Sequence, residues 1–215
     1  MFNFTRALDR NADRWPDREA LVFGPRRLSN ADLNARVNAL AAALTRLGIR
    51  RGDVVSILLY NCPEFLETTL AVNKLGAIFL PLNYRLAPPE WAYILGHAGA
   101  VAMVTEPEFA SALDPVRADV PALKEVIQVG ADYEGRLAAE EGALVPTADV
   151  GADDIQRLMY TSGTTARPKG VPLSYGNVLW KVFGHIVEFG LTDADSTLMT
   201  CLLYTSDAAD DLTRV

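Results

Sequence analysis

The first 130 residues alternate between short continuous runs of apolar residues and longer segments in which apolar residues recur every three or four positions. The continuous runs occupy residues 54–59, 77–82, 101–105 and 125–129, and such runs are typical of strands buried on both faces. The segments between them, residues 63–76, 88–98 and 109–118, have helical spacing. Strands that alternate with helices of about 10–15 residues indicate βαβ units. The pattern therefore predicts an α/β fold with a parallel-rich sheet and helices on both faces.

The segment before these units predicts two helices and a pair of short strands. Residues 4–14 form an amphipathic pattern that Pro16 ends, because the residue before a proline is disfavoured in a helix. A strand at residues 20–23 is followed by a glycine turn and a second short strand. The Ser-x-x-Asp sequence at Ser29 resembles a capping box and begins a long helix, which Gly48 is expected to end. Its apolar side chains at helical spacing predict a core face.

Composition narrows the possible functions. Half of the 215 residues are hydrophobic and 22% are charged, as in ordinary globular proteins that bury a core. The net charge of −7 argues against a surface for nucleic acid or anionic membranes, and no apolar run reaches the ~18 residues of a transmembrane helix. The amino terminus lacks the pattern of a secretory signal. Cys62 and Cys201 fit no metal or redox spacing, so we expect a cytoplasmic protein with two reduced thiols. The sequence does not predict the oligomeric state.

Residues 158–171, LMYTSGTTARPKGV, combine hydroxyl side chains, glycines and a lysine behind a short apolar run. Residues 155–160 and 171–173 look extended, which predicts a strand, a loop and a second strand. Small residues let the backbone approach a polyanion, and N–H and hydroxyl groups can then donate to phosphate oxygens. Lys169 adds a point charge, and Arg167 can add another. The loop is not a Walker A motif because its lysine precedes its glycine. A plain polar surface loop is the alternative interpretation.

Residues 160–170, YTSGTTARPKG, resemble the signature phosphate loop of the adenylate-forming enzymes, the superfamily of acyl-CoA synthetases, adenylation domains and luciferases. Ala166 stands where the usual pattern has a glycine, which reduces the freedom of the backbone at one position. The family often has a histidine at the position of Tyr175, which is a second departure. The resemblance covers essentially residues 4–200, and it implies that the chain is the first part of an enzyme more than twice as long.

The resemblance implies two half-reactions that use ATP, Mg²⁺ and coenzyme A in the full-length enzyme. A small-molecule carboxylate, expected to be a fatty or similarly apolar acid, attacks the α-phosphate of ATP to give an acyl-adenylate and pyrophosphate. The thiol of coenzyme A then displaces AMP. The residues implied to bind the β- and γ-phosphates are Thr161, Ser162, Gly163, Thr164, Thr165 and Lys169. The adenosine contacts, the magnesium-binding glutamate and the catalytic lysine come later in the family, so we expect no catalytic residue or metal ligand in this chain and no activity from it alone.

Two other functions remain open. One is an adenylation domain that loads an amino or aryl acid onto a carrier protein, and the other is a non-catalytic α/β module whose loop binds anions. A chain that begins at Met1 with its own first helix, and that carries no condensation or carrier segment, favours the free-standing synthetase. A downstream motif bearing a glutamate would separate the enzymatic functions from the non-catalytic one.

We divide the chain into a first α/β subdomain (1–130), a connector with at most a short helix (131–152), the phosphate-loop hairpin with the start of a second subdomain (153–200), and a tail (201–215). In the third part, residues 174–177 begin a helix that continues to Gly190, and residues 196–200 are expected to begin another strand. The tail carries three aspartates in five residues and resembles translated sequencing-adapter read-through. We interpret it as non-native, with a native acidic terminus as the alternative.

Several polar residues outside the loop are weaker candidates. Asn61, Asn83, Tyr84 and Arg85 follow strand ends, where α/β sheets often place ligand groups. We favour a role for them in turns and caps. His97 and His185 receive no role, because neither has a partner at the spacing of metal ligands.

Overall fold

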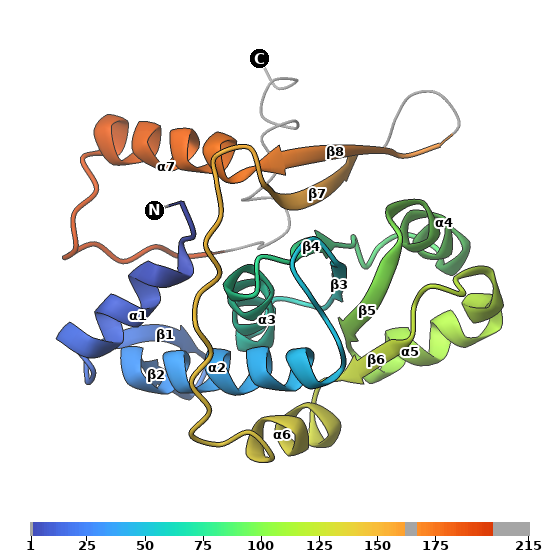
Figure 1. The fold of residues 1–215 in the computed structure, drawn as a ribbon, viewed down its shortest axis with the longest axis horizontal. Helices are drawn as coiled ribbons and strands as arrows, with labels where there is room; N and C mark the ends of the chain where they lie inside the picture. Colours follow the sequence, from blue (N-terminus) through green and yellow to red (C-terminus); the bar gives the residue numbers. More distant parts are fainter. Residues whose placement is uncertain (1, 162–166, 200–215) are drawn as a thin grey trace.

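The computed structural model describes residues 2–161 and 167–199, and its centre is a six-stranded sheet covered by helices (Figure 1). The strands follow the order β6-β5-β3-β4-β7-β8, with bounds β3 Val54–Leu58, β4 Ile78–Pro81, β5 Ala100–Thr105, β6 Glu125–Gln128, β7 Ile155–Thr161 and β8 Lys169–Ser174. Every neighbouring pair is parallel except β7 and β8, which form an antiparallel hairpin. The predicted α/β fold with a parallel-rich sheet is confirmed.

The described helices are α1 Thr5–Arg14, α2 Asn30–Arg46, α3 Pro63–Lys74, α4 Pro88–Ala98, α5 Pro107–Leu113, α6 Ala131–Ala138 and α7 Tyr175–Phe189. Five of them, α2 to α6, pack on the two faces of this sheet, and α1 and α7 lie outside these two layers. Successive side chains of a strand point to opposite faces, so β3 supplies two cores. Val55 and Ile57 pack in the core with α2, α3 and α6, whereas Val54 and Leu58 pack in the core with α4 and α5. The fully buried β3 explains its continuous apolar sequence.

The elements before the sheet form as their local sequence predicts. Strands β1 (Glu19–Phe23) and β2 (Arg26–Ser29) pair in an antiparallel hairpin. Ser29 caps α2: its Oγ accepts from the N–H of Asp32 at 3.1 Å, and the Asp32 carboxylate accepts from the N–H of Ser29 at 3.0 Å. The Ser29 hydroxyl also donates to the Asp32 carboxylate at 2.8 Å, and this bond, together with the one from the Ser29 N–H, lowers the pKa of Asp32. The helix ends before Gly48, whose φ of +85° lies in the left-handed region that favours glycine.

The helix predicted at residues 109–118 is partly wrong. Helix α5 spans Pro107–Leu113, and a 3-10 helix, η1, continues over Asp114–Asp119. Pro107 is pre-organised for the first helical position, which moves the start earlier. Pro115 has no N–H to donate and its ring clashes with the carbonyl four residues earlier, so the α-helix cannot pass through it.

The strand expected to begin at residue 196 is also absent from the described part of this segment. Residues 196–199 are exposed and have no assigned secondary structure. A strand needs a hydrogen-bonded neighbour, and the described sheet ends at β8. The preceding segment instead approaches the amino-terminal region, where Arg18 Nη1 lies 3.5 Å from Asp193 Oδ2. Residue 200 and the interpreted tail at 201–215 lie outside the described residues.

The segment expected to be a connector is anchored along its length. It contains α6 and then crosses α2 as an extended chain (Figure 1). The N–H of Val145 donates to Oδ1 of Asn38 at 3.0 Å, and the N–H of Ala148 donates to the carbonyl of Lys74 at 2.8 Å. The strand β7 that follows pairs with β4 through Phe79 and Arg157. The hairpin therefore joins the sheet of the first 130 residues, and the division into subdomains stays a prediction.

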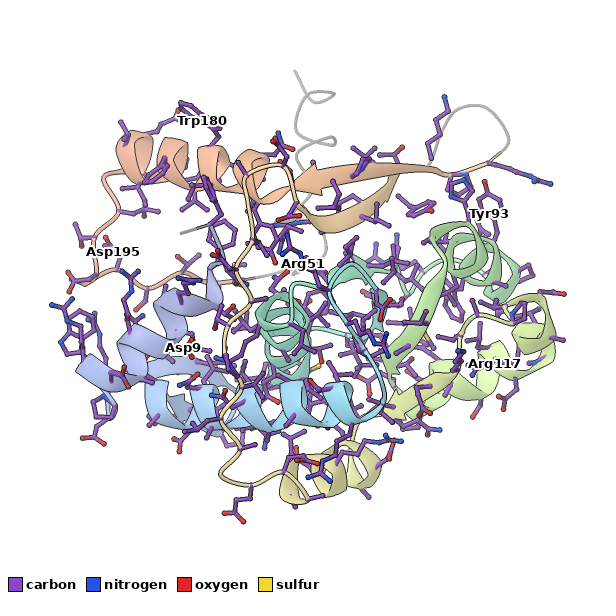
Figure 2. The ribbon with its side chains drawn as sticks, in the orientation of Figure 1. Asp9, Arg51, Tyr93, Arg117, Trp180 and Asp195 are labelled. Atoms are coloured by element: carbon purple, nitrogen blue, oxygen red, sulfur yellow. The ribbon has the colours of Figure 1, made fainter. Side chains whose placement is uncertain are left out.

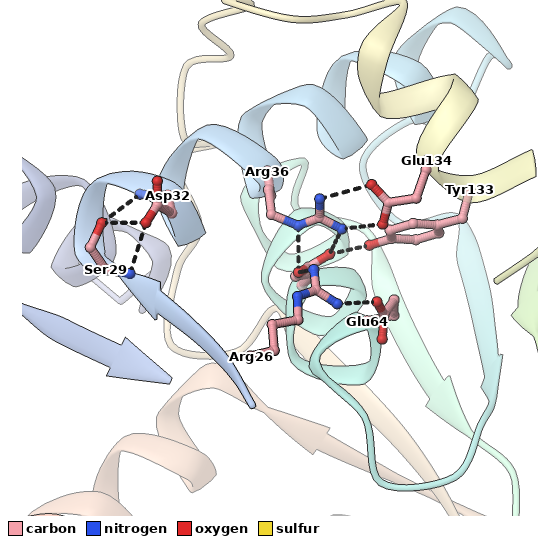
Figure 3. A network of polar contacts seen from close by, with 8 residues as sticks. Arg26, Ser29, Asp32, Arg36, Glu64, Tyr133 and Glu134 are labelled. Atoms are coloured by element: carbon pink, nitrogen blue, oxygen red, sulfur yellow. Dashed lines mark hydrogen bonds and ion pairs between the residues drawn. The ribbon is translucent and has the colours of Figure 1, made fainter. Parts of the chain in front are cut away.

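A polar network ties α6 to the rest of the fold (Figure 3). Its members come from β2, α2, α3 and α6: Arg26, Arg36, Glu64, Glu67, Tyr133 and Glu134. Glu67 lies at its centre with a fully buried side chain, which accepts from Arg36 Nε at 2.7 Å and from the Tyr133 hydroxyl at 2.8 Å. Buried carboxylates are tolerated only when they are paired in this way. The network fixes four elements to one another.

Candidate phosphate-binding site

The predicted phosphate loop connects the two strands of the terminal hairpin. Thr161 is the last residue of β7, Lys169 is the first of β8, and the two are partners across the hairpin. The structure therefore brings these two predicted site residues together at the base of the loop. The other four, Ser162, Gly163, Thr164 and Thr165, lie outside the described residues. The two strands predicted on either side of the loop are confirmed.

The loop leaves the sheet at the edge where α/β proteins commonly bind ligands. Strand β7 runs parallel to β4, and β4 runs parallel to β3, so the carboxyl ends of these strands share one edge of the sheet. Helix α3 joins β3 to β4 over one face and α4 joins β4 to β5 over the other. The crossovers change face and direction after β4, which puts the topological switch between β3 and β5, at the carboxyl ends where such sheets commonly bind ligands. Thr161, at the carboxyl end of β7, lies at the same edge of the sheet, on the other side of β4 from β3.

Two cations flank the loop on the side where it enters β8. Arg167 and Lys169 are both exposed. Among the ion pairs that the structure describes, neither residue has a carboxylate partner. An exposed ammonium and an exposed guanidinium beside a loop rich in hydroxyl groups fit the oxygens of a polyphosphate.

Helix α4 contacts both ends of the loop. His97 Nδ1 lies 2.6 Å from the hydroxyl of Tyr160, the residue before Thr161. The guanidinium carbon of Arg167 lies 5.4 Å from the centre of the Tyr93 ring, and the Tyr93 ring stacks on His97 at 5.6 Å. Figure 2 shows Tyr93 extending from α4 toward β8. Burial, with a smaller effect of Tyr93, raises the pKa of the Tyr160 phenol, so this hydroxyl stays protonated near neutral pH.

Sequence reasoning missed this arrangement, since it left His97 without a role. His97 and Tyr160 are 63 positions apart, and no spacing rule joins them. The single local signal is the four-residue separation of Tyr93 and His97, which puts both side chains on one face of a helix.

Arg157 lies within β7, and its described contacts are with Phe79 and Gln156. Its guanidinium carbon lies 5.1 Å from the Phe79 ring, and its Nε donates to Oε1 of Gln156 at 2.7 Å. Burial lowers the pKa of Arg157 to about 10, so the side chain remains charged at neutral pH. Its contact with Phe79 lies at the point where the hairpin joins β4.

The residues after the ends of β3 and β4 serve local structure. Oδ1 of Asn83 accepts from the N–H of Arg85 at 2.9 Å, as in a turn stabilised by an asparagine side chain, and the carbonyl of Asn83 accepts from the indole N–H of Trp91 at 3.0 Å. The Tyr84 ring packs edge-on against Tyr60, with ring centres 4.9 Å apart. These contacts support the interpretation that Asn83, Tyr84 and Arg85 shape a turn.

A hollow of about 300 Å³ lies between α1, α2 and the extended segment after α6. Its most buried charge is already paired within it. Lys74 Nζ lies 2.6 Å from Oδ1 of Asp9, and the hydroxyl of Thr147 donates to the other carboxylate oxygen at 2.8 Å. The Lys74 side chain is 1% exposed, which fits a role in packing rather than in binding a ligand.

Two other candidates, His185 and Cys62, have their described contacts elsewhere in the chain. His185 is exposed on α7 and contacts Phe189, with ring centres 5.6 Å apart. Burial raises the pKa of the Cys62 thiol to about 12, which makes it a poor nucleophile. Within residues 2–161 and 167–199, no three His, Cys, Asp or Glu side chains gather as metal ligands would. In the same ranges, every helix is too short or too polar to cross a membrane.

Comparison with known proteins agrees with this geometry. The sequence profile of the family described as AMP-binding enzyme matches residues 8–207. A feruloyl-CoA synthase from an Amycolatopsis species is 37% identical over 195 residues, which are 91% of this chain and 38% of that protein. An indoleacetate–CoA ligase from Aromatoleum aromaticum is 36% identical over 205 residues, which are 92% of this chain and 40% of that protein. The chain thus spans about two fifths of the length of these relatives.

Solved structures show the same fold. A fatty acyl-CoA synthetase from Mycobacterium tuberculosis superposes with a TM-score of 0.74 and 33% identity, over 81% of this chain and 35% of that one. An anthranilate CoA ligase in complex with anthranoyl-AMP superposes with a TM-score of 0.79 and 27% identity, over 85% of this chain and 37% of that one.

Proposed function

Because the chain belongs to the family of AMP-binding enzymes, we propose that the protein that carries it is an AMP-forming acyl-CoA synthetase. The observation that supports this best is the β7–β8 hairpin, which presents Lys169 and Arg167 beside a hydroxyl-rich loop. Neither cation is paired with a carboxylate in the described structure, so both are available to an anion of high charge.

The proposed reaction has two steps. An oxygen of the substrate carboxylate attacks the α-phosphorus of ATP, the bond to the bridging oxygen breaks, and pyrophosphate leaves. The thiolate of coenzyme A then attacks the acyl carbonyl, and AMP leaves with the bonding electrons. In the first step, Lys169 neutralises charge on the β- and γ-phosphates, while Thr161 and the proposed contacts Ser162, Gly163, Thr164 and Thr165 hold those phosphates in line with the attack.

The described residues do not fit every group that the reaction needs. They fit a polyphosphate, but they hold no cluster of acidic side chains for Mg²⁺. We assign the Mg²⁺ ligands, the adenosine contacts and the coenzyme A site to the part of the protein that its relatives have beyond this chain. When bound, Mg²⁺ would offset charge on the phosphate oxygens. A cytoplasmic location is part of the proposal and rests on the low cysteine content of the sequence, whose two cysteines fit no metal or redox spacing.

The acid is proposed to be apolar. One similar solved structure is a fatty acyl-CoA synthetase, whereas the relatives named for feruloyl-CoA and indoleacetate point to aromatic acids. A fatty acid and an aryl acid are therefore both included as candidate substrates. The second candidate function is an adenylation domain that transfers the acyl group to a carrier protein. The superfamily includes enzymes that use coenzyme A as the acceptor and enzymes that use a carrier protein. The two functions differ in the acceptor of the acyl group, so the acceptor is what the experiment must vary.

The test is carboxylate-dependent exchange of radiolabelled pyrophosphate into ATP by the full-length protein. Fatty, cinnamic-type and indole acids would be compared with amino acids, and thioester formation would then be followed with coenzyme A. We expect exchange with an apolar acid and thioester formation with coenzyme A. Exchange without transfer to coenzyme A would favour the carrier-protein function. ATP binding without exchange for any acid would favour an anion-binding module.

We further propose that the 215-residue chain alone is inactive. Positioning of reactants supplies up to ~7–11 kcal/mol of barrier reduction in well-oriented systems, and a loop that contacts only the outer phosphates cannot orient the α-phosphate against a carboxylate. The same assays on the purified chain should show no turnover above a control without protein. Binding of ATP should be about millimolar or weaker. Micromolar binding, or turnover that depends on coenzyme A, would show that the active site is more complete than proposed.

A further inference from the structure

We propose that Tyr93 and His97 of α4 are positioning residues for the phosphate loop, because they hold its two ends at the mouth of the β7–β8 hairpin. This inference rests on the proposed function and deepens it. Neither residue belongs to the loop motif, and neither is offered as a contact to ATP. Their proposed effect is to keep Thr161 and Lys169 where the phosphates need them.

The first contact fixes the strand that enters the loop. The Tyr160 hydroxyl and His97 Nδ1 are 2.6 Å apart, which is a short hydrogen bond, and the two rings meet nearly at right angles, at 88°. Helix α4 is itself rigidly placed, since Trp91, Ile94 and Leu95 are buried in the core beneath it. The hydrogen bond thus joins the end of β7 to an element that the core holds in place.

The second contact carries this constraint across the hairpin. Tyr160 and Gly170 are partners in the β7–β8 register. A methyl group at Gly170 would lie 3.0 Å from Cζ of Tyr160 and 3.1 Å from its hydroxyl oxygen, so the ring lies directly over the glycine backbone. Close approach of this kind is possible because glycine has no side chain. A ring held by His97 therefore also restrains the residue that follows Lys169.

The third contact holds the exit of the loop. The guanidinium of Arg167 lies over the Tyr93 ring, in the range of a cation–π interaction, and the Tyr93 ring stacks in turn on His97. Tyr93 and His97 are four residues apart, so one face of α4 serves both ends of the loop.

The expected consequence is weaker ATP binding when these contacts are removed. If Thr161 and Lys169 are already held in place before ATP binds, less conformational freedom is lost when they contact its phosphates. The contacts touch no reacting atom, so they should act equally on ground state and transition state. Loss of such uniform binding raises KM and leaves kcat unchanged. Overall destabilisation would instead reduce the amount of active enzyme without a selective change in the KM for ATP.

The test uses the full-length protein with Tyr160→Phe, which removes only the hydroxyl, with His97→Ala, and with both together. Each single variant should raise the KM for ATP about three- to tenfold, as expected for one hydrogen bond. The double variant should show the same rise rather than the product, because both changes remove one bond. The KM for the acid and for coenzyme A, and kcat, should stay within about twofold.

Three further variants sharpen the test. His97→Asn keeps a polar atom near the position of Nδ1 and should restore much of the ATP affinity. Tyr93→Leu should raise the KM for ATP about two- to fivefold, as expected for an exposed cation–π contact. His185→Ala is the matched control, because this exposed histidine on α7 contacts Phe189 of the same helix; its replacement should leave the KM for ATP unchanged.

Failure of this inference can be told apart from failure of the proposed function. An active wild-type enzyme whose KM for ATP does not change in Tyr160→Phe and His97→Ala would overturn the inference alone. A fall in kcat with an unchanged KM for ATP would also overturn it. If the wild-type protein exchanges pyrophosphate with no acid, calorimetric titration with ATP still decides. Weaker binding in the two variants than in wild type and His185→Ala would support the inference, and equal binding would refute it.

Discussion

Replacing Glu67 by glutamine tests whether the buried polar network stabilises the fold. Glu67 lies on α3 with no exposed side-chain surface, and its carboxylate accepts hydrogen bonds from Arg36 Nε at 2.7 Å, Arg36 Nη2 at 3.0 Å and Tyr133 Oη at 2.8 Å. Arg26 Nη2 adds a contact at 3.3 Å. Glutamine has nearly the same shape as glutamate, so the change removes charge without leaving a cavity. It also places an amide N–H₂ group, which can only donate, against the N–H and O–H donors of the arginine and tyrosine side chains.

The size of the expected loss of stability depends on the carboxylate partners that Arg36 and Arg26 keep in the variant. Removing one partner of a buried ion pair costs roughly 3–5 kcal/mol when the other charge is left uncompensated. Here Arg36 keeps Glu134 at 2.6 Å and Arg26 keeps Glu64 at 2.5 Å, and the arginine side chains are 20% and 32% exposed. Solvent and the remaining carboxylates therefore offset part of the loss. We expect Glu67→Gln to lower the free energy of unfolding by about 2–3 kcal/mol.

The measurement is urea unfolding of the full-length protein followed by circular dichroism. Tyr133→Phe removes a single hydrogen bond to Glu67 and should cost about 1 kcal/mol. Glu19→Gln is the matched control, since the pair of Glu19 with Arg27 is exposed on both sides and should be worth at most about 1 kcal/mol. If Glu67→Gln unfolds at the same urea concentration as Glu19→Gln, the reasoning that the buried network stabilises these four elements is wrong.

Three other predictions address function, pH and surface. Lys169→Ala should slow pyrophosphate exchange roughly ten- to hundredfold, because it removes one charge-assisted phosphate contact, whereas unchanged kinetics would exclude Lys169 from the site. The hydrogen bond from Arg36 lowers the pKa of Glu134 below its ordinary 4.5, so this pair stabilises the fold above that pH, and the contribution is lost as the pH falls through the lowered pKa. Glu134→Gln should therefore flatten the loss of stability between pH 7 and pH 3, and an unaltered pH profile would argue against the pair. Trp180 and Val187 of α7 are 80% and 83% exposed, so a protein of residues 1–199 should bind a hydrophobic dye at this helix. The double variant Trp180→Ser, Val187→Ser should give a weaker dye signal. An equal signal would mean that the dye binds an apolar surface elsewhere.

The local sequence was sufficient to predict most of the elements and the position of the loop. Caps and breakers act within a few residues, as the Ser29 capping box and the Ser174 cap of α7 show. The continuous apolar run of β3 reflects burial on both faces, which is visible without its neighbours. The helix predicted at residues 109–118 runs across Pro115, which instead lies in the 3-10 helix η1; the effect of this proline on the backbone is also local and could have been read from the sequence.

Only the tertiary structure decided which distant residues meet. Strand order brought β7 beside β4, and with it placed Tyr160 within hydrogen-bonding distance of His97, 63 positions away. The same holds for Tyr133, which the sequence placed in the connector and which donates to Glu67 in the core, 66 positions away. Periodicity shows which face of an element is apolar, but not which element will cover it. That choice depends on the packing of all the layers together, so the contacts that hold the ends of the phosphate loop could not be predicted from the sequence.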